Sequence, residues 1–94
     1  MSVVRLTGQL VCKSEVESTL VAKNLPEHVS LTRREPGCLA FDVTRSSDPL
    51  VWNVDEQFAD DRAFRTHQER VASSEWGRVT ADAERRYSID GWSP

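Results

Sequence analysis

A helix end that leads directly into a strand is encoded at residues 35–45. Pro36 cannot continue a helix, and Gly37 accepts the backbone angles at which helices commonly end. From residue 39 to 44 apolar side chains alternate with smaller or polar ones, which is the period of a strand with two different faces. After a Ser-Ser-Asp-Pro turn, residues 50–58 repeat the alternation. This segment predicts a helix exit followed by a β-hairpin. One face of the first hairpin strand should carry Leu39, Phe41 and Val43.

The same reasoning predicts two further strands and two helices. The strands are expected at 3–12 and 83–91, where apolar and polar residues alternate. One helix should begin after Ser14, in a capping box, and another at Asp60 or Asp61. Strand, helix, strand, strand, helix, strand is the ferredoxin-like βαββαβ order, in which both helices cover one face of a four-stranded antiparallel sheet. The predicted fold class is therefore α+β.

The first predicted helix contains a proline, Pro26. Proline removes one backbone hydrogen bond and crowds the preceding turn, so we expect a kink or a short break there. The face of this helix toward the core should carry Val16, Leu20 and Val21. His28 lies in a charged segment beyond the proline and is expected to be exposed.

Three smaller features concern the space around the core. Gly8 stands on the core face of the first strand, where its missing side chain leaves room for a neighbouring group or a ligand. The run Ser-Ser-Glu-Trp at 73–76 should start a short extra turn that carries Trp76 inward. The tail Gly91–Pro94 is expected either to be loose or to reach a partner subunit.

Length and charge restrict the class of protein. Ninety-four residues form one domain, 1–94, which as a monomer would bury only about two-thirds of its unfolded surface, so a homodimer is favoured. The net charge of −3, with acids and bases intermixed, argues against a nucleic-acid surface. No apolar run approaches the roughly 20 residues of a membrane helix, and no signal-peptide pattern precedes the first strand. We therefore expect a cytoplasmic protein without nucleic-acid or membrane partners.

The cysteines and histidines do not form a metal-binding pattern. Cys12 and Cys38 fall in different predicted strands without a Cys-x-x-Cys spacing, so we expect two buried thiols rather than a disulfide. His28 and His67 lie at no ligand spacing from either cysteine. The sequence also lacks a phosphate-binding loop, a nucleophile elbow and a dinucleotide fingerprint. An enzyme of this sequence would use the reactivity of its substrate, or a cofactor that such motifs do not reveal.

Several of these features occur together in one known family. They are Glu-Pro-Gly-Cys-Leu at 35–39, the alternating strand, the Asp-Pro turn, a strand that ends in an aromatic residue, and Asp-Asp-Arg-Ala-Phe-Arg-Thr-His at 60–67. In this combination the chain resembles the antibiotic biosynthesis monooxygenase family, whose small ferredoxin-like domains include quinol and anthrone oxygenases. The resemblance implies a homodimer of the dimeric α/β-barrel kind. It also implies a monooxygenase that needs no flavin, haem or metal.

The predicted site is a cavity between the sheet and the helices. Aromatic walls with few polar groups suit a planar phenolic or quinol ligand. His67 lies on the apolar face of its helix and matches a histidine that recurs at this place in the family. As a base, His67 would remove a phenol proton, and oxygen would then react with the electron-rich anion. The candidate substrate-binding residues are Phe41, Trp52, Phe58, Phe64, Trp76 and Tyr87.

Other interpretations of these residues stay open. The aromatic side chains would serve equally as an ordinary core, and His67 as a core or dimer-interface histidine with one hydrogen bond. Arg86 and Tyr87 are candidates for binding a quinone oxygen, and so is Asn53. Asn53 lies on the strand face opposite Trp52, so these two residues cannot line one pocket, and we rank Trp52 higher.

Two departures from the family pattern bear on the chemistry. Phe58 stands where many relatives have tryptophan. The haem-degrading branch combines that tryptophan with an asparagine on the first strand and a histidine beyond the second helix. Here the first strand has no asparagine, and residues 77–80 contain no histidine, so haem degradation is disfavoured.

The sequence thus favours a cofactor-independent monooxygenase that oxidises a hydroxylated aromatic, quinol or anthrone-type polyketide substrate with molecular oxygen. One alternative is a non-catalytic dimeric module that binds a small aromatic molecule. A second alternative is an isomerase or cyclase of polyketide-like intermediates, which needs a base but no oxygen.

Overall fold

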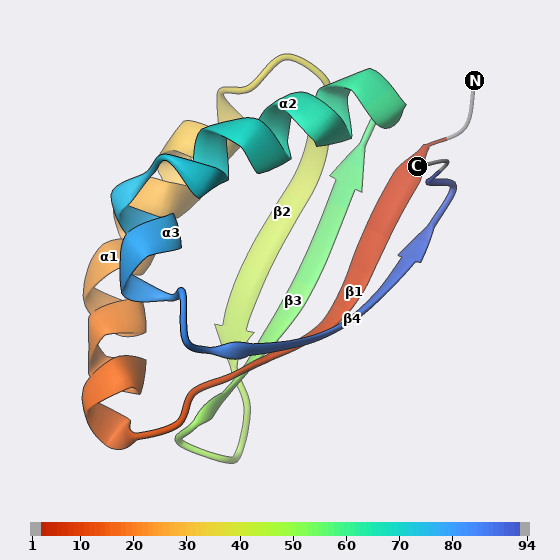
Figure 1. The fold of residues 1–94 in the computed structure, drawn as a ribbon. Coiled ribbons are helices and arrows are strands. Elements are labelled where there is room, and N and C mark those ends of the chain that lie inside the picture. The colour runs from red at the N-terminus through yellow and green to blue at the C-terminus, as the bar shows by residue number, and fades with distance from the viewer. Residues whose placement is uncertain (1–2, 93–94) are drawn as a thin grey trace.

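Four strands and three helices make up residues 3–92, the part of the chain that this computed structural model describes. Figure 1 shows their arrangement, and the predicted ferredoxin-like order is confirmed. The short turn predicted around Trp76 is a third helix of five residues, α3. Within residues 3–92 no helix is long and apolar enough to cross a bilayer. In chain order the elements are β1 (Val4–Val11), α1 (Glu15–Arg33), β2 (Cys38–Arg45), β3 (Val51–Phe58), α2 (Asp61–Ala72), α3 (Glu75–Val79) and β4 (Glu84–Asp90).

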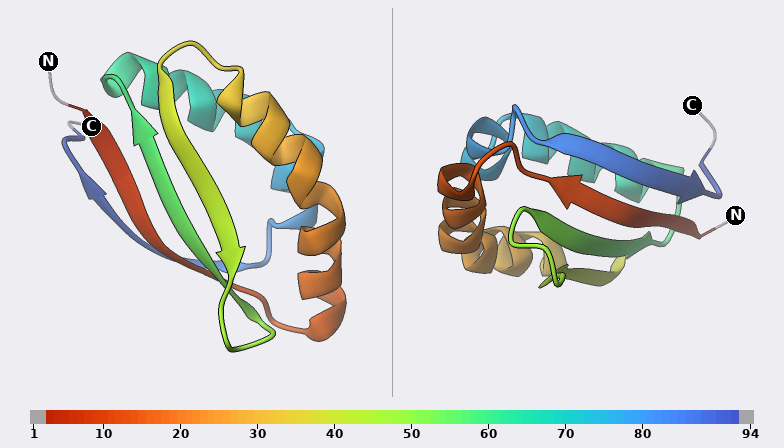
Figure 2. Two further views of the ribbon diagram at one scale, coloured as in Figure 1. Left: turned by 180° about the vertical axis from the view of Figure 1, so that it is seen from behind. Right: turned by 90° about the horizontal axis from the view of Figure 1, so that it is seen from below.

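The four strands form one antiparallel sheet in the order β2-β3-β1-β4. All three helices lie on one face of this sheet (Figures 1 and 2). The core lies between the two layers, because the strands direct alternate side chains toward the helices. Trp92, beyond β4, packs edge-on against Phe64, with ring centroids 4.9 Å apart, while Ser93 and Pro94 lie outside the described residues. The buried apolar residues of the sheet include Val4, Leu6, Leu10, Phe41, Trp52, Val54 and Phe58.

A β-bulge at the start of β2 changes the predicted face of Leu39. Cys38 pairs with Phe58, but Ala40 already pairs with Gln57, so Leu39 is an extra residue without a partner on β3. Its side chain is 57% exposed, whereas that of Phe41 is buried. The prediction that Leu39 shares the inner face of Phe41 was therefore wrong, because alternation does not persist across a bulge.

Helix α1 continues through Pro26 without a break. Ser14 caps its first turn, since the serine Oγ accepts a hydrogen bond from the backbone N–H of Glu17. Just before the proline, the side-chain amide of Asn24 donates to the carbonyl of Leu20 within the same helix. Figure 2 shows that the helix bends along its length, which is the effect expected of a proline in the helix interior.

Of the three residues predicted to face the core from α1, only Val21 does so. Val16 is 74% exposed and Leu20 is also exposed. Two polar residues of the inner face, Ser18 and Thr32, are hydrogen-bonded to other parts of the chain. The Ser18 hydroxyl donates to the carbonyl of Pro49 and accepts from Trp52 Nε1, at 2.7 and 3.1 Å. Residues three and four positions apart form this face, namely Ser18, Val21, Leu25, His28 and Thr32.

The group that occupies the space beside Gly8 is the backbone of strand β4. A Cβ atom at this position would lie 2.1 Å from the carbonyl oxygen of Arg86, and the φ angle of Gly8 is +147°. Both the distance and the angle exclude a side chain here. Gly8 thus allows β4 to pair closely with the central strand.

Replacing Gly8 by alanine should destabilise the fold by about 2–4 kcal/mol, since β4 must move or the backbone must strain. The free energy of unfolding, from urea titration followed by circular dichroism, measures the effect. Glu69→Ala, at an exposed position of α2, is the control and should change stability by less than about 0.5 kcal/mol. Equal stability of the two variants would show that β4 does not approach Gly8 in this way.

Candidate functional site

A cavity of about 110 Å³ opens between the sheet and the helices. For comparison, an apolar cavity of about 150 Å³ is known to hold benzene, so this space is close to the size of one aromatic ring. Side chains from all three helices and from β1, β3 and β4 surround it. Its lining consists of Leu6, His28, Glu56, His67, Gln68, Val71, Trp76, Arg85, Tyr87 and Ile89.

His67 is held at this cavity by α2 and by the helix exit that precedes β2. Asp60 caps α2 by accepting a hydrogen bond from the backbone of Ala63, which fixes where the helix begins. The His67 side chain is 3% exposed, and its Nδ1 lies 2.8 Å from Oε1 of Glu35. On the other side of the ring, Nε2 lies 3.6 Å from Oε1 of Glu56. The imidazole therefore stands between two carboxyl groups.

Arg70 forms an ion pair with only one of these two carboxyl groups. Its guanidinium forms an ion pair with the second oxygen of Glu35 and donates to the Thr32 hydroxyl at 2.9 Å. With Glu35 anionic, the His67 proton belongs on Nδ1, which donates to this carboxylate. Nε2 is then a free acceptor on the side of Glu56 and the cavity.

Burial lowers the pKa of His67, and this effect outweighs the opposing attraction of Glu35. The imidazole is therefore neutral at pH 7. A neutral, oriented imidazole with a free nitrogen at a cavity is the arrangement that a general base requires.

Glu56 was not recognised as a candidate from the sequence. Its side chain follows Trp52 and Val54 on the core-facing side of β3, and the residue is only 7% exposed. Burial, and next the repulsion from Glu35, raises the pKa of Glu56 to about 8, while Arg85 acts in the opposite direction. At neutral pH this carboxyl group is therefore protonated. The available signal was a charged residue at an otherwise apolar set of alternating positions in 50–58.

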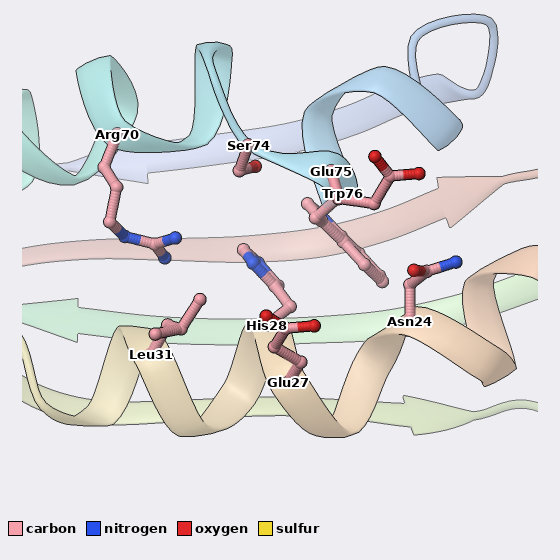
Figure 3. A pocket seen from close by; sticks show the side chains of 8 residues that line it. All are labelled: Asn24, Glu27, His28, Leu31, Arg70, Ser74, Glu75 and Trp76. Atoms are coloured by element: carbon pink, nitrogen blue, oxygen red, sulfur yellow. The ribbon is translucent and has the colours of Figure 1, made fainter.

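The prediction that His28 is exposed was wrong, because the residue is 4% exposed and faces the sheet from α1. Its ring stacks on Trp76 with centroids 4.3 Å apart and planes 2° apart. The two side chains meet between α1 and α3, as Figure 3 shows, and a second cavity of about 30 Å³ lies beside them. Burial lowers the pKa of His28 to about 3. Within residues 3–92 its buried Nδ1 has no hydrogen-bond partner.

Of the six aromatic residues predicted to line the cavity, only two do, and Phe41, Phe58 and Phe64 are instead buried in the core and do not line it. The rings of Phe58 and Phe41 lie 4.8 and 5.8 Å from the ring of His67, centroid to centroid, and Phe64 packs against Phe58. Trp76 and Tyr87 line the cavity itself. Burial raises the pKa of Tyr87 to about 12, so its hydroxyl stays protonated.

Trp52 is not brought to this cavity. Its indole N–H donates to Ser18 near the start of α1, and the Arg45 guanidinium lies 4.5 Å from the ring centroid. Asn53 and Arg86 point to the opposite face of the sheet, and Arg85 lines the cavity instead. The alternation of the sequence correctly placed Asn53 and Trp52 on opposite faces of β3. It could not show that Trp52 lies away from the cavity, near the start of α1.

Both cysteines are free thiols, one buried and one half-buried. Burial is the largest influence on each and raises the pKa of both Cys12 and Cys38. In the described part of the chain, no group of three or more histidine, cysteine or acidic side chains is placed to hold a metal ion. The polar groups of the cavity thus include the neutral imidazoles of His67 and His28 and the protonated carboxyl group of Glu56, with the Arg85 guanidinium and the Tyr87 hydroxyl beside them.

The buried, neutral His28 predicts a pH-dependent stability. The unfolded chain binds a proton at His28 below its ordinary pKa of 6.5, but the folded protein does not until about pH 3. Stability is therefore lost as the pH falls below 6.5. His28→Phe keeps a ring against Trp76 but cannot bind a proton. Between pH 6.5 and pH 5 the wild type should lose about 2 kcal/mol more than this variant. Urea unfolding at each pH measures the difference, and parallel curves would contradict the burial of His28.

Comparison with known proteins agrees with this architecture. The model of the antibiotic biosynthesis monooxygenase family matches residues 5–79. A solved structure from Nitrosomonas europaea, provisionally named as the same kind of monooxygenase, is 19% identical with a TM-score of 0.75, and the match covers 94% of this chain and 93% of that one. A Bacteroides thetaiotaomicron protein of unknown function, described as a possible oxidoreductase, is 20% identical with a TM-score of 0.73, over 94% and 95% of the two chains.

A Pseudomonas aeruginosa protein is similar to the same degree, at 22% identity and a TM-score of 0.71, over 96% and 91% of the chains. At such identities the structural likeness shows the fold alone. No functionally curated protein matches the sequence significantly. The family model, in contrast, spans most of the length. The chain therefore belongs to the antibiotic biosynthesis monooxygenase family.

Proposed function

We propose that the protein is a cofactor-independent monooxygenase that oxidises a hydroxylated aromatic or quinol with molecular oxygen, with His67 as the catalytic base. One observation carries the proposal. His67 is neutral, its Nδ1 is fixed by the Glu35–Arg70 ion pair, and its Nε2 is free at a cavity close to one ring in size.

The first chemical step is a proton transfer. The substrate hydroxyl donates its proton to Nε2 of His67, and the imidazolium that forms is stabilised by the Glu35 carboxylate. The phenolate then passes one electron to oxygen, and the resulting radical pair combines to form a carbon–oxygen bond. The protein removes the proton and positions the ring, while the electrons come from the substrate.

The cavity volume favours the smaller members of the predicted substrate class. A single-ring quinol is close to the available 110 Å³, whereas a three-ring anthrone exceeds it. A larger ring system would have to displace the His28–Trp76 stack, which lines both this cavity and the smaller one beside it. Trp76 and Tyr87 are the proposed substrate contacts. Phe41, Phe58 and Phe64 are proposed to hold His67 in place, and Trp52 to act through packing alone.

A second function is favoured by a different observation. A protonated carboxyl group, Glu56, and a free imidazole nitrogen of His67 lie 3.6 Å apart at one cavity. Such an acid–base pair suits the movement of a proton between two positions of a carbonyl compound. An isomerase would use the same residues and leave the mass of its substrate unchanged.

Oxygen uptake by the purified, metal-free protein tests the proposal. With benzoquinols the rate should exceed the autoxidation blank, and His67→Ala should reduce this excess by about 100-fold or more. The other imidazole at the cavity, His28, is a much weaker base, because burial lowers its pKa to about 3. The uptake should be larger with one-ring quinols than with naphthoquinols or anthrones.

Each result of this experiment separates the functions. A product that gains oxygen supports the monooxygenase, and an altered product of unchanged mass identifies the isomerase. Binding without any conversion identifies a non-catalytic module that holds small aromatic molecules. Glu69→Gln, on the exposed side of α2, is the matched control and should leave the uptake unchanged.

We also propose that two copies associate through the sheet face that the helices leave uncovered. This face carries polar side chains, including the Arg5–Asp55 ion pair at 3.1 Å and the neighbouring Gln9 and Asn53. A second sheet packed on this face would add the burial that a chain of 94 residues lacks as a monomer. The helix-side cavity would keep the same lining in such a dimer.

Sedimentation equilibrium should give twice the chain mass of 10.6 kDa. Asn53→Lys, at an exposed position of the uncovered face, should weaken the dimer at least about tenfold, since it adds a charge to the interface. Glu69→Lys introduces the same residue on the outer side of α2 and should have no effect. A monomer at all concentrations, or equal weakening by both variants, would contradict this interface.

A further inference from the structure

We propose that Glu56 is a second catalytic residue, the acid that protonates the peroxide formed when oxygen adds to the substrate. The inference rests on the proposed monooxygenase function and assigns a role to a side chain that this function does not yet use. Its basis is the position of the carboxyl group at the cavity, beside the proposed base.

The location of Glu56 is unusual for an acidic side chain. Strand β3 directs it into the core between Val54 and Phe58. Burying a carboxyl group without a hydrogen bond costs about 1–3 kcal/mol, and more if the group is charged. Within residues 3–92 the Glu56 carboxyl makes no hydrogen bond, and its closest basic group is His67 Nε2, at 3.6 Å. A glutamine or an apolar residue would meet the packing requirement as well, so packing alone does not explain the acid.

Charged and titratable groups from several elements surround Glu56, including the Cys38 thiol of β2. Glu35, at the helix exit, acts against ionisation of Glu56, and so does Asp55, which precedes it on β3. Arg85 on β4 favours ionisation. His67 on α2 and His28 on α1 are neutral, and Tyr87 on β4 is protonated. Because desolvation dominates this balance, Glu56 keeps its proton up to a pKa of about 8.

The distance between Glu56 and His67 suits two proton transfers to one ligand. At 3.6 Å the two groups are too far apart to hydrogen-bond well with each other. An oxygen atom placed beside them in the cavity can lie about 2.8 Å from both at once. A substrate hydroxyl and the peroxide attached to the neighbouring carbon are thus both within reach of this pair.

The proton balance closes with these two residues. His67 takes the hydroxyl proton of the substrate, oxygen adds to the adjacent ring carbon, and Glu56 donates its proton to the terminal oxygen of the peroxide anion. The hydrogen of the attacked carbon then leaves as a proton to the Glu56 carboxylate. The oxygen–oxygen bond breaks as the new carbonyl forms, and the departing hydroxide takes the proton from His67. Oxygen is reduced to one carbonyl oxygen and one water, the substrate loses four electrons, and both residues regain their starting states.

The experiment compares Glu56→Gln with the wild type, using benzoquinol and isotopically labelled oxygen. Without the acid, the adduct should lose its peroxide group as hydrogen peroxide. This loss leaves the quinone without an added oxygen atom. The variant should form about 100-fold less labelled hydroxyquinone, and hydrogen peroxide per oxygen consumed should rise toward one. In the wild type, formation of labelled product per oxygen should fall as the pH rises through about 8, where Glu56 ionises. The variant should lack this pH dependence.

Two further variants exclude a merely structural effect. Glu56→Asp keeps the acid and should retain part of the labelled product, although the shorter side chain places the proton farther from the peroxide. Glu69→Gln removes an exposed glutamate and should behave as wild type. The same labelled yield in wild type and Glu56→Gln would overturn the role of Glu56 while leaving the monooxygenase proposal intact.

An infrared measurement tests the role proposed for Glu56 separately from the proposed monooxygenase function. The difference spectrum of wild type and Glu56→Gln at pH 7, without substrate, should contain the C=O band of a protonated carboxyl group. Absence of the band would overturn the proposal whatever the activity. Absence of oxygen uptake from the wild type, with the band present, would overturn the monooxygenase function together with this role in it.

Discussion

The ion pair between Glu35 and Arg70 is the contact on which the candidate site depends. Glu35 ends the first helix region and Arg70 lies near the end of α2, so the pair joins two parts of the chain that β2 and β3 separate. It gives the His67 imidazole a fixed acceptor for Nδ1. Thr32 adds a hydrogen bond to the same guanidinium. The orientation of the proposed base is thus set by tertiary contacts and not by α2 alone.

Apart from the Arg85 guanidinium, the titratable groups that line the cavity beside this ion pair stay uncharged. His28 and His67 are deprotonated because burial lowers their pKa values, and Glu56 is protonated because burial raises its pKa. Neutral donors and acceptors cost less to desolvate than ions, so an aromatic ring can displace water from them. A phenolate formed in this place would gain a nearby imidazolium as its counter-ion, which links the proton transfer to the binding of the reactive anion.

Local patterns predicted the order of the elements, the helix caps and the inward position of Trp76, because each depends on neighbouring residues. The predictions that failed depend on partners distant in the chain. Ser18 and Thr32 are buried on α1 because Trp52 and Arg70 bind them, and this rotation of the helix also buries His28. The bulge at Leu39 follows from its pairing with β3. His67 was found through its helical face, whereas Glu56 looked like an ordinary interruption of an apolar strand.

Glu35 and Glu56 show how one residue type takes two roles at a single histidine. Both carboxyl groups flank the ring of His67, at 2.8 and 3.6 Å. Of the two carboxyl groups, Arg70 contacts only that of Glu35, so this side of the ring holds the ion pair. Glu56 is repelled by the carboxylate of Glu35. Among the described residues its only close basic partner is His67, and it keeps its proton. The Glu35–Arg70 ion pair therefore fixes which nitrogen of His67 carries hydrogen, and burial of Glu56 places a protonated carboxyl group on the cavity side of the ring.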